Sequence, residues 1–388
     1  MELSERIIPV EPSATLAITS RAKAMLAEGE NVVILAAGEP DFDTPDIVKK
    51  AAIKAIKEGQ TKYTPAGGTV SLKKAISDKL SRDNGLKYDT SEIVISVGAK
   101  HSLYNLFQVT LNPGDEVLIV HPYWVSYPEM VKLADGAPKI VKTKKENGFR
   151  VSPDEIKSAL TDRTRALVIN SPSNPAGVVY DREELEKIAE VCLANNLLVV
   201  SDEIYEKILY DGKEHFSIAA MSEEMKASTI VVNGVSKSYS MTGWRIGYMA
   251  GDKDIIKAVT TLQSHSTSNP CSISQAAAEC ALREGLEKIM EKNRKEFEKR
   301  RNALIKSISE DERLEPFEPA GAFYLFCDIS RCGLDSMTFA KRLLEEKKVA
   351  VIPGGPFGDD RYIRISFATD LATIEEGVKR IKDWVNKL

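Results

Sequence analysis

The residues from Asn233 to Gly247 combine the side chains that covalent catalysis with a carbonyl compound requires. A strand-like run ends in small residues, Lys237 follows at once, and Arg245 comes eight residues later between glycines. A lysine amine can form an imine with an aldehyde, and a guanidinium group can clamp a phosphate through its planar fork. The pattern predicts that Lys237 carries an aldehyde cofactor whose phosphate binds Arg245. A Ser-Lys dipeptide alone would indicate only a surface loop.

A carboxylate follows the apolar run 197–201, which we expect to be a buried strand. Open α/β sheets bind their ligands at the carboxyl ends of parallel strands, where Asp202 would lie. Asp202 could pair with a protonated ring nitrogen of the cofactor and keep the ring cationic, so that the ring accepts electrons. Tyr205 would then reach the ring hydroxyl. The alternative role for Asp202 is a helix N-cap.

A turn with two prolines follows another apolar run, in residues 170–177. Its two X-Pro bonds fix the chain and permit a cis bond. The turn would aim the amide of Asn174 at the oxygen of the cofactor ring. By itself, this segment indicates only a good turn.

The residues Gly98, Ala99 and Lys100 follow the run 93–97 and open a predicted helix. Exposed amides at the start of a helix bind phosphate well. Such junctions are common, so this motif supports a phosphate site only together with Arg245.

The elements that must position these residues form an α/β pattern. Short β-branched runs alternate with amphipathic segments, which is typical of a largely parallel sheet covered on both faces. The predicted strands are 93–97, 116–120, 166–170, 197–201, 229–233 and 246–250, with a helix at 182–194. The final third predicts a smaller α+β unit, with a long helix over 286–309, strands at 322–327, 349–352 and 362–367, and a closing helix from 371. The first residues, with a helix near 20–28 and a strand at 31–35, should join this smaller unit.

The composition is that of a globular protein of two domains. The chain has 388 residues, 43% hydrophobic and 28% charged, and a formal charge of -4, so it lacks the basic surplus expected for nucleic-acid binding. No leader-like or membrane-spanning apolar stretch is present, and we expect a cytoplasmic protein. The 5 cysteines are scattered and predict neither a disulfide framework nor a metal site.

These motifs together resemble the class I/II aminotransferases of fold type I. The resemblance extends from Gly-Glu-Pro-Asp-Phe at 38–42 to Arg364, and within the class the chain is similar to bacterial and archaeal aspartate aminotransferases of the gamma subgroup. It implies pyridoxal 5'-phosphate as cofactor, amino acids and 2-oxo acids as substrates, and a homodimer with shared active sites. It also implies an N-terminal arm and part of the small domain in 1–45, a large cofactor-binding α/β domain in 46–284, and a small α+β domain in 285–388.

The resemblance assigns roles to further residues. Tyr63 would reach the cofactor phosphate of the neighbouring subunit, and Trp124 would stack on the pyridine ring. Gly38 and Arg364 would hold the substrate α-carboxylate, Arg364 as a bidentate partner. Asn174 and Trp124 would also contact the substrate.

Lys100, with Ser13 and Thr15 on a mobile N-terminal segment, would meet the distal carboxylate of aspartate, which favours an aspartate aminotransferase. A basic residue before Pro-Ser-Ala-Thr accompanies prephenate use, but this chain has Glu11 there. The alternatives are an aminotransferase for prephenate, aromatic or branched-chain substrates, or a carbon-sulfur lyase on the same fold. If the protein is not an enzyme, the alternative function is that of a catalytically silent, ligand-sensing relative. The alternative role of Lys100 is that of an ordinary solvated lysine at the start of a helix.

Overall fold

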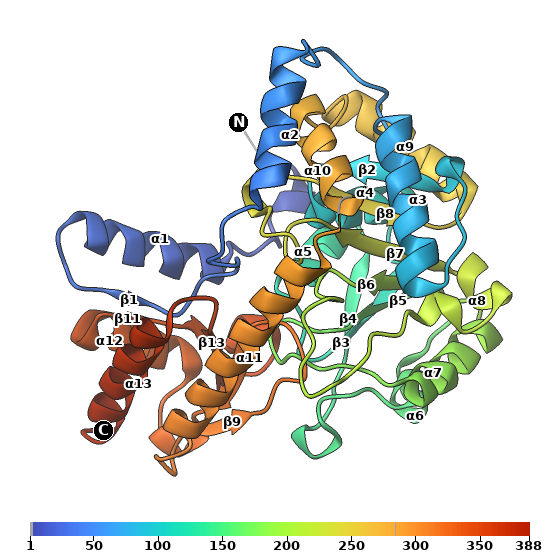
Figure 1. Ribbon diagram of the computed structural model, residues 1–388. Helices are drawn as coiled ribbons and strands as arrows, with labels where there is room; N and C mark the ends of the chain where they lie inside the picture. The colour runs from blue at the N-terminus through green and yellow to red at the C-terminus, as the bar shows by residue number, and fades with distance from the viewer. Residues whose placement is uncertain (1–2, 284) are drawn as a thin grey trace.

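The centre of the molecule is a twisted sheet with helices on both faces (Figure 1). The computed structural model describes residues 3–283 and 285–388. Within them, the spatial order of the strands in this sheet is β2 (Ile93–Ser96), β8 (Gly247–Ala250), β7 (Thr229–Gly234), β6 (Leu198–Asp202), β5 (Thr164–Asn170), β3 (Glu116–Val120) and β4 (Ala137–Val141). The strands from β7 to β4 are parallel, and β8 pairs antiparallel with both of its neighbours. The predicted, largely parallel sheet is confirmed.

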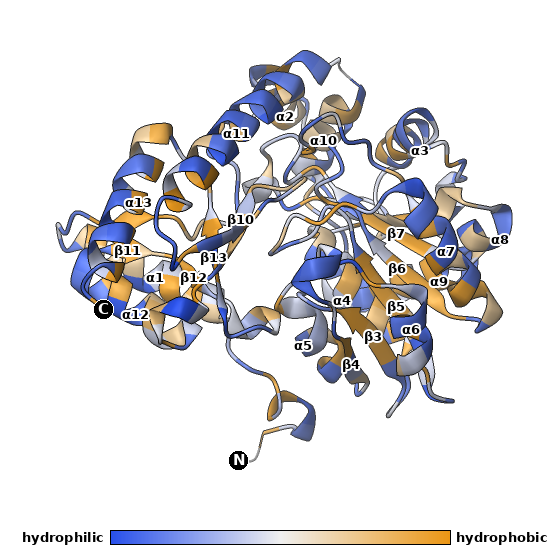
Figure 2. Cartoon of the chain, turned by 90° about the horizontal axis from the view of Figure 1, so that it is seen from below, coloured by the Kyte–Doolittle hydropathy of each residue, from blue (hydrophilic) through white to orange (hydrophobic). Residues whose placement is uncertain are grey.

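Both faces of the sheet carry apolar side chains, and helices therefore cover both faces. In Figure 2 the strands are mostly orange, whereas the helices carry blue outer surfaces. One face packs against α4 (Ala99–Thr110), α5 (Ser126–Leu133) and α9 (Lys253–Ser266). The other face packs against α2 (Asp46–Lys57), α3 (Val70–Asn84), α6 (Pro153–Ala159), α7 (Arg182–Ala194), α8 (Glu223–Ala227) and α10 (Ser272–Arg283). Burial on both faces is the expected environment of a parallel sheet.

A second unit is built from the two ends of the chain. Its antiparallel sheet has the order β12 (Ile352–Pro353), β13 (Tyr362–Ser366), β10 (Tyr324–Asp328) and β9 (Glu315–Phe317). The helices of this unit are α1 (Ala14–Ala27), α11 (Glu287–Ile308), α12 (Ser336–Lys347) and α13 (Leu371–Val385). Strand β1 (Val33–Ile34) pairs in parallel with β11 (Val349–Ala350), so the N-terminal segment lies against the C-terminal unit.

Several details differ from the sequence predictions. Helix α1 begins at Ala14 rather than near residue 20, because Ser13 caps it through its side chain. Strands β4 and β9 had not been predicted. The predicted domain limits, 1–45, 46–284 and 285–388, remain a prediction, and residue 284 lies outside the described residues.

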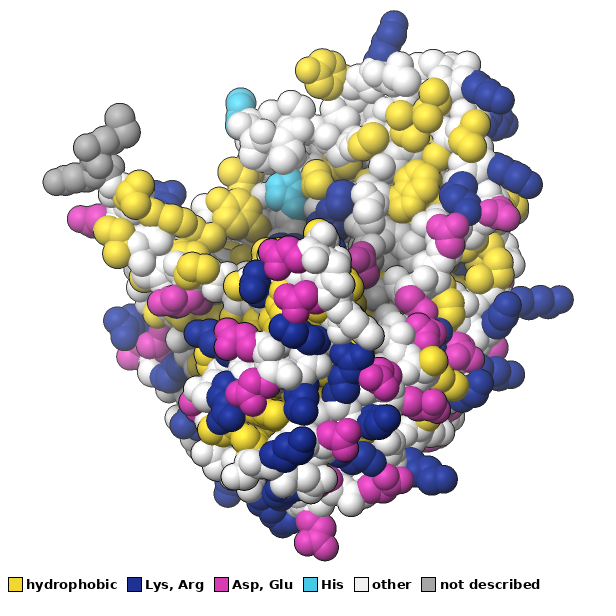
Figure 3. Space-filling model, turned by 90° about the vertical axis from the view of Figure 1, so that its left-hand side faces the viewer, with side chains coloured by type: hydrophobic (Ala, Val, Ile, Leu, Met, Phe, Trp, Pro, Cys, Tyr) yellow, Lys and Arg dark blue, Asp and Glu magenta, His cyan; other side chains and the backbone are white. Residues whose placement is uncertain are grey.

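The surface carries charges of both signs. Over the face shown in Figure 3, Lys and Arg side chains are interspersed with Asp and Glu side chains, and the N-terminal segment projects from the body. This segment exposes hydrophobic side chains, including Leu3 and Ile8. No helix among the described residues is long and apolar enough to cross a membrane.

Candidate active site

A cavity of about 450 Å³ lies at the carboxyl ends of β5, β6 and β7. The second unit closes it through α1, the segment 36–39, β10 and β13. Of the predicted residues, the cavity is lined by Thr15, Gly38, Ala99, Lys100, Trp124, Asn174, Asp202, Tyr205, Lys237, Arg245 and Arg364. The structure thus brings together residues that lie far apart in the sequence.

Lys237 follows β7 and lines this cavity. Its Nζ donates a hydrogen bond to the backbone oxygen of Gly38 at 2.6 Å. Burial lowers the pKa of Lys237 to about 8, although the negative charge of Glu39 acts in the opposite direction. A larger share of the amine is therefore neutral near pH 7 than for an exposed lysine, and the neutral amine is the nucleophile.

Asp202 ends β6 and is 4% exposed. Its Oδ2 accepts a hydrogen bond from the hydroxyl of Tyr127 at 2.6 Å, and Oδ1 accepts one from the backbone N–H of Ile204 at 3.2 Å. Burial raises the pKa of Asp202 to about 6 despite these bonds. A cation placed next to this carboxylate would stabilise its charged form. The sequence analysis missed Tyr127, which lies on α5 after Trp124.

Arg245 and the start of α4 form an anion cradle. Gly98 is the N-cap of α4, and Ala99 is the first residue of the helix. Arg245 has a left-handed backbone with φ of 56° and donates from Nη1 to the backbone oxygen of Thr242 at 3.0 Å. Gly98 has a φ of 89°, which favours glycine, and a Cβ there would lie 2.8 Å from Nη2 of Arg245. The amides at the start of α4 and the guanidinium together suit a phosphate.

Arg364, on β13, is 2% exposed and forms a second cationic site. Its Nη1 donates to Oδ1 of Asn174 at 2.9 Å, and Nη2 donates to the backbone oxygen of Ala36 at 3.2 Å. Its Nε has no hydrogen-bond partner in the described chain. The guanidinium carbon lies 4.2 Å from the ring centre of Tyr324, whose hydroxyl is 2.9 Å from that of Tyr205. A buried cation with an unused donor suits a carboxylate ligand.

Lys100 and α1 line the same cavity from another side. The Nζ of Lys100 lies 4.7 Å from the centre of the Trp124 ring. Burial, followed by the charge of Arg245, lowers the pKa of Lys100. Thr15 has a buried hydroxyl without a partner in the described chain, and Thr19 and Lys23 follow it at helical spacing. The sequence analysis missed Thr19 and Lys23, although their four-residue spacing after Thr15 would have placed them on one helix face.

The structure also describes the predicted X-Pro bonds and Tyr63. The bonds before Pro172 and Pro175 are both cis, as the sequence permits. Tyr63 is 90% exposed and does not line the cavity of its own chain.

Comparison with known proteins decides the family. The model of the family described as aminotransferase class I and II matches residues 30–381. The chain belongs to the class I and II aminotransferases. This aminotransferase is 54% identical over 388 residues to the aspartate aminotransferase of Bacillus sp. strain YM-2, with 99% of each chain covered.

Solved structures agree with this family assignment. The aspartate aminotransferase from Rhizobium meliloti matches this aminotransferase with a TM-score of 0.96 and 41% identity, and both chains are covered completely (100%). That of Thermus thermophilus, solved with maleate, matches with a TM-score of 0.95 and 42% identity over 100% of each chain. The predicted fold, an α/β fold of type I with a large, mainly parallel sheet, is thereby confirmed.

Proposed function

We propose that this aminotransferase is an aspartate aminotransferase that uses pyridoxal 5'-phosphate and transfers the amino group of L-aspartate to 2-oxoglutarate. One observation carries the proposal: Lys237, the Asp202 carboxylate and the Arg245 guanidinium line one cavity. An aldehyde bearing a ring nitrogen and a phosphate matches these three groups at once.

The residues of the cavity fit this cofactor. The cradle at Gly98, Ala99 and Arg245 offers amides and a fixed cation to the phosphate. The carboxylate of Asp202 would bind the ring nitrogen. Tyr205 and Asn174 would donate to the ring oxygen, and Trp124 would cover the ring face.

When bound, the cofactor supplies a cationic ring that accepts the electron pair left on the substrate Cα after its proton is removed. Lys237, as the free amine, would accept that proton as general base and later donate it as general acid. Asp202 holds the proton on the ring nitrogen. Arg364 binds the α-carboxylate and fixes the Cα–H bond in reach of Lys237.

The distal part of the cavity favours dicarboxylic substrates. Lys100 places a cation beside Trp124, and Thr15 has a buried hydroxyl in need of a partner. The related Thermus thermophilus enzyme was solved with maleate, which is itself a dicarboxylate. Glu11 puts a negative charge where prephenate use would favour a basic residue, so prephenate is not proposed as a substrate.

We also propose a cytoplasmic homodimer in which Tyr63 of one subunit reaches the cradle of the other. The almost complete exposure of Tyr63 supports this arrangement, as do exposed hydrophobic side chains at Ile53, Ile56 and Val70. Amino acids and oxo acids are its proposed partners, with neither nucleic acid nor membrane. Residues 1–45 and 285–388 would move as a small domain against 46–284.

Two measurements test the function. Borohydride reduction of the protein loaded with pyridoxal phosphate, followed by peptide mapping, should place the label on Lys237. Label on another lysine, or none, would refute the cofactor assignment and favour a silent relative.

Absorbance changes of the bound cofactor across a panel of amino acids then test the substrate. We expect aspartate and glutamate to convert the cofactor fastest. Preference for aromatic or branched amino acids, or release of pyruvate and thiol from cystathionine, would support the alternatives.

A further inference from the structure

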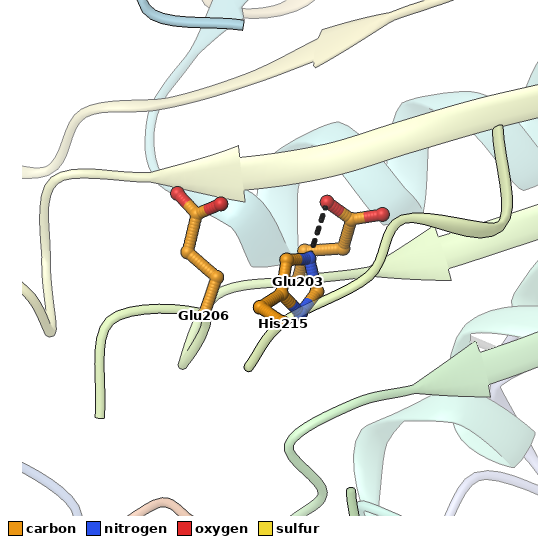
Figure 4. Close-up of side chains that lie close together, drawn as sticks. All are labelled: Glu203, Glu206 and His215. Carbon is orange, nitrogen blue, oxygen red and sulfur yellow. Dashed lines mark hydrogen bonds and ion pairs between the residues drawn. The ribbon is translucent and has the colours of Figure 1, made fainter. Parts of the chain in front are cut away.

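Glu203 and Glu206, which are buried just after β6, form a cluster with the partly buried His215 (Figure 4). One possible ligand atom from each of these residues lies within 4.8 Å of the others, an arrangement that could hold a metal ion. However, the amino group of Lys79 forms an ion pair with Glu206. A metal ion would have to displace this ammonium group, which already supplies the positive charge. We therefore looked for a role of the cluster in which Lys79 is the cation.

The turn after β6 presents its side chains on two sides. Asp202 and Tyr205 line the large cavity, whereas Glu203 and Glu206 do not. The two glutamates are 1% and 5% exposed, so they point into the protein on the far side of the turn. Asp202 and Tyr205 are thus each followed in the sequence by a buried glutamate.

Glu206 ties the turn to helix α3. It pairs with Lys79, which is 2% exposed, and its Oε2 accepts a hydrogen bond from Nδ2 of Asn84 at 2.9 Å. Asn84 in turn accepts a bond from Nζ of Lys79 at 2.8 Å, which closes a three-residue network. Burial raises the pKa of Glu206, but Lys79, His215 and Lys207 together outweigh this effect and lower the pKa to about 2, so the carboxylate is ionised.

Glu203 ties the same turn to the strand before it and to the segment 215–217. Its Oε1 accepts hydrogen bonds from the hydroxyls of Ser201 at 2.8 Å and Ser217 at 2.5 Å. Its Oε2 lies 3.0 Å from Nε2 of His215, the contact drawn in Figure 4. Both carboxylate oxygens are therefore engaged.

We propose that Lys79, Glu203 and Glu206 are positioning residues that fix the turn 202–206, so that Asp202 and Tyr205 meet the cofactor ring in one geometry. This inference rests on the proposed function. Apolar packing alone would hold the turn without fixing its register, whereas ionic and hydrogen-bonded contacts have preferred directions. A catalytic group that is displaced slightly from its productive position makes a weaker contact with the ligand.

The test compares single substitutions in the loaded protein. Glu206→Gln and Glu203→Gln keep the shape of the side chain but remove its charge. Glu116→Gln is the matched control, because Glu116 is 7% exposed and accepts a hydrogen bond from Thr161 at 2.7 Å at the opposite, amino end of the same sheet. The readouts are the dissociation constant of pyridoxal phosphate and the induced circular dichroism of the bound cofactor, with far-UV circular dichroism as the check of folding.

We expect Glu206→Gln and Glu203→Gln to raise the dissociation constant about tenfold and to change the induced signal, as the loss of an outer partner does for other bound groups. Glu116→Gln should change the dissociation constant less than about twofold, because distant sites act independently. Wild-type binding by both cluster variants, or equal weakening by the control, would overturn the inference.

If Glu206→Gln does not fold, Glu203→Gln decides the question, because it leaves the ion pair between Lys79 and Glu206 in place. Wild-type affinity and an unchanged induced signal in Glu203→Gln would then overturn the inference. Failure of the wild-type protein itself to take up the cofactor would refute the proposed function instead.

Discussion

Arg364 donates a hydrogen bond from Nη1 to Oδ1 of Asn174 at 2.9 Å, although the two residues are 190 positions apart. Because Oδ1 accepts from Arg364, the amide nitrogen of Asn174 is left as a donor for a ligand in the cavity. The bond also holds the guanidinium group beside the cavity without neutralising it. One neutral side chain thus links the proposed carboxylate site to the proposed cofactor site.

Asn174→Asp should therefore harm substrate binding more than Asn174→Ala. An aspartate at this position would form an ion pair with Arg364 and compete with the substrate α-carboxylate. We expect the KM of every amino acid to rise by about tenfold or more, the loss expected for a charged hydrogen bond. Steady-state kinetics with aspartate and glutamate measure the effect. A larger rise in KM for Asn174→Ala would contradict this account.

Arg364→Ala should raise the KM of all amino acids alike, because it removes the partner of the group that they share. Arg364→Lys should restore little, since an ammonium group cannot form the two parallel hydrogen bonds of a guanidinium. The measurement is the ratio of KM values for aspartate and alanine in each variant. A loss confined to dicarboxylic substrates would mean that Arg364 binds the distal carboxylate.

Lys100→Met, unlike Arg364→Ala, should impair the reaction of dicarboxylic amino acids alone. It removes the cation next to Trp124 and keeps a side chain of similar length. We expect kcat/KM for aspartate to fall by about tenfold or more, while the value for alanine stays within about twofold. Equal losses for both substrates would instead assign Lys100 to cofactor binding.

Part of this site could be predicted from the sequence because two of its chemical groups come at the ends of recognisable apolar runs. Lys237 and Asp202 come directly after apolar runs that the structure shows as β7 and β6. Since parallel strands present their carboxyl ends at one edge, the two side chains had to lie near each other.

Tyr127 and Lys79 could not be predicted in the same way. Each acts through a contact with a residue far along the chain, Asp202 and Glu206 respectively. Helix periodicity places both on buried faces but does not identify the partner. Strand β4 was missed for a related reason, because its residues are only partly buried and lack a continuous apolar pattern.

Lys237→Met should make the protein without cofactor more stable at pH 7. Partial burial in the cavity lowers the pKa of Lys237 to about 8 from 10.5. Removal of this buried amine should raise the free energy of unfolding by about 1–3 kcal/mol, after allowance for cavity solvent and for the lost bond to Gly38. Urea unfolding measures the difference, and Lys23→Met, at an exposed position on α1, is the control.

The pH dependence of the free energy of unfolding distinguishes the lowered pKa of Lys237 from an effect of side-chain packing. The pKa of Lys237 is lower in the folded protein, so between about pH 8 and 10.5 the unfolded chain binds more protons than the folded one. The wild-type protein should thus gain stability as the pH rises through this range, and its difference from Lys237→Met should shrink. Packing of the methionine side chain would give a difference that is the same at pH 7 and pH 9.5. An equal difference at the two pH values would show that Lys237 keeps its ordinary pKa, which would remove the physical reason for its enhanced nucleophilicity.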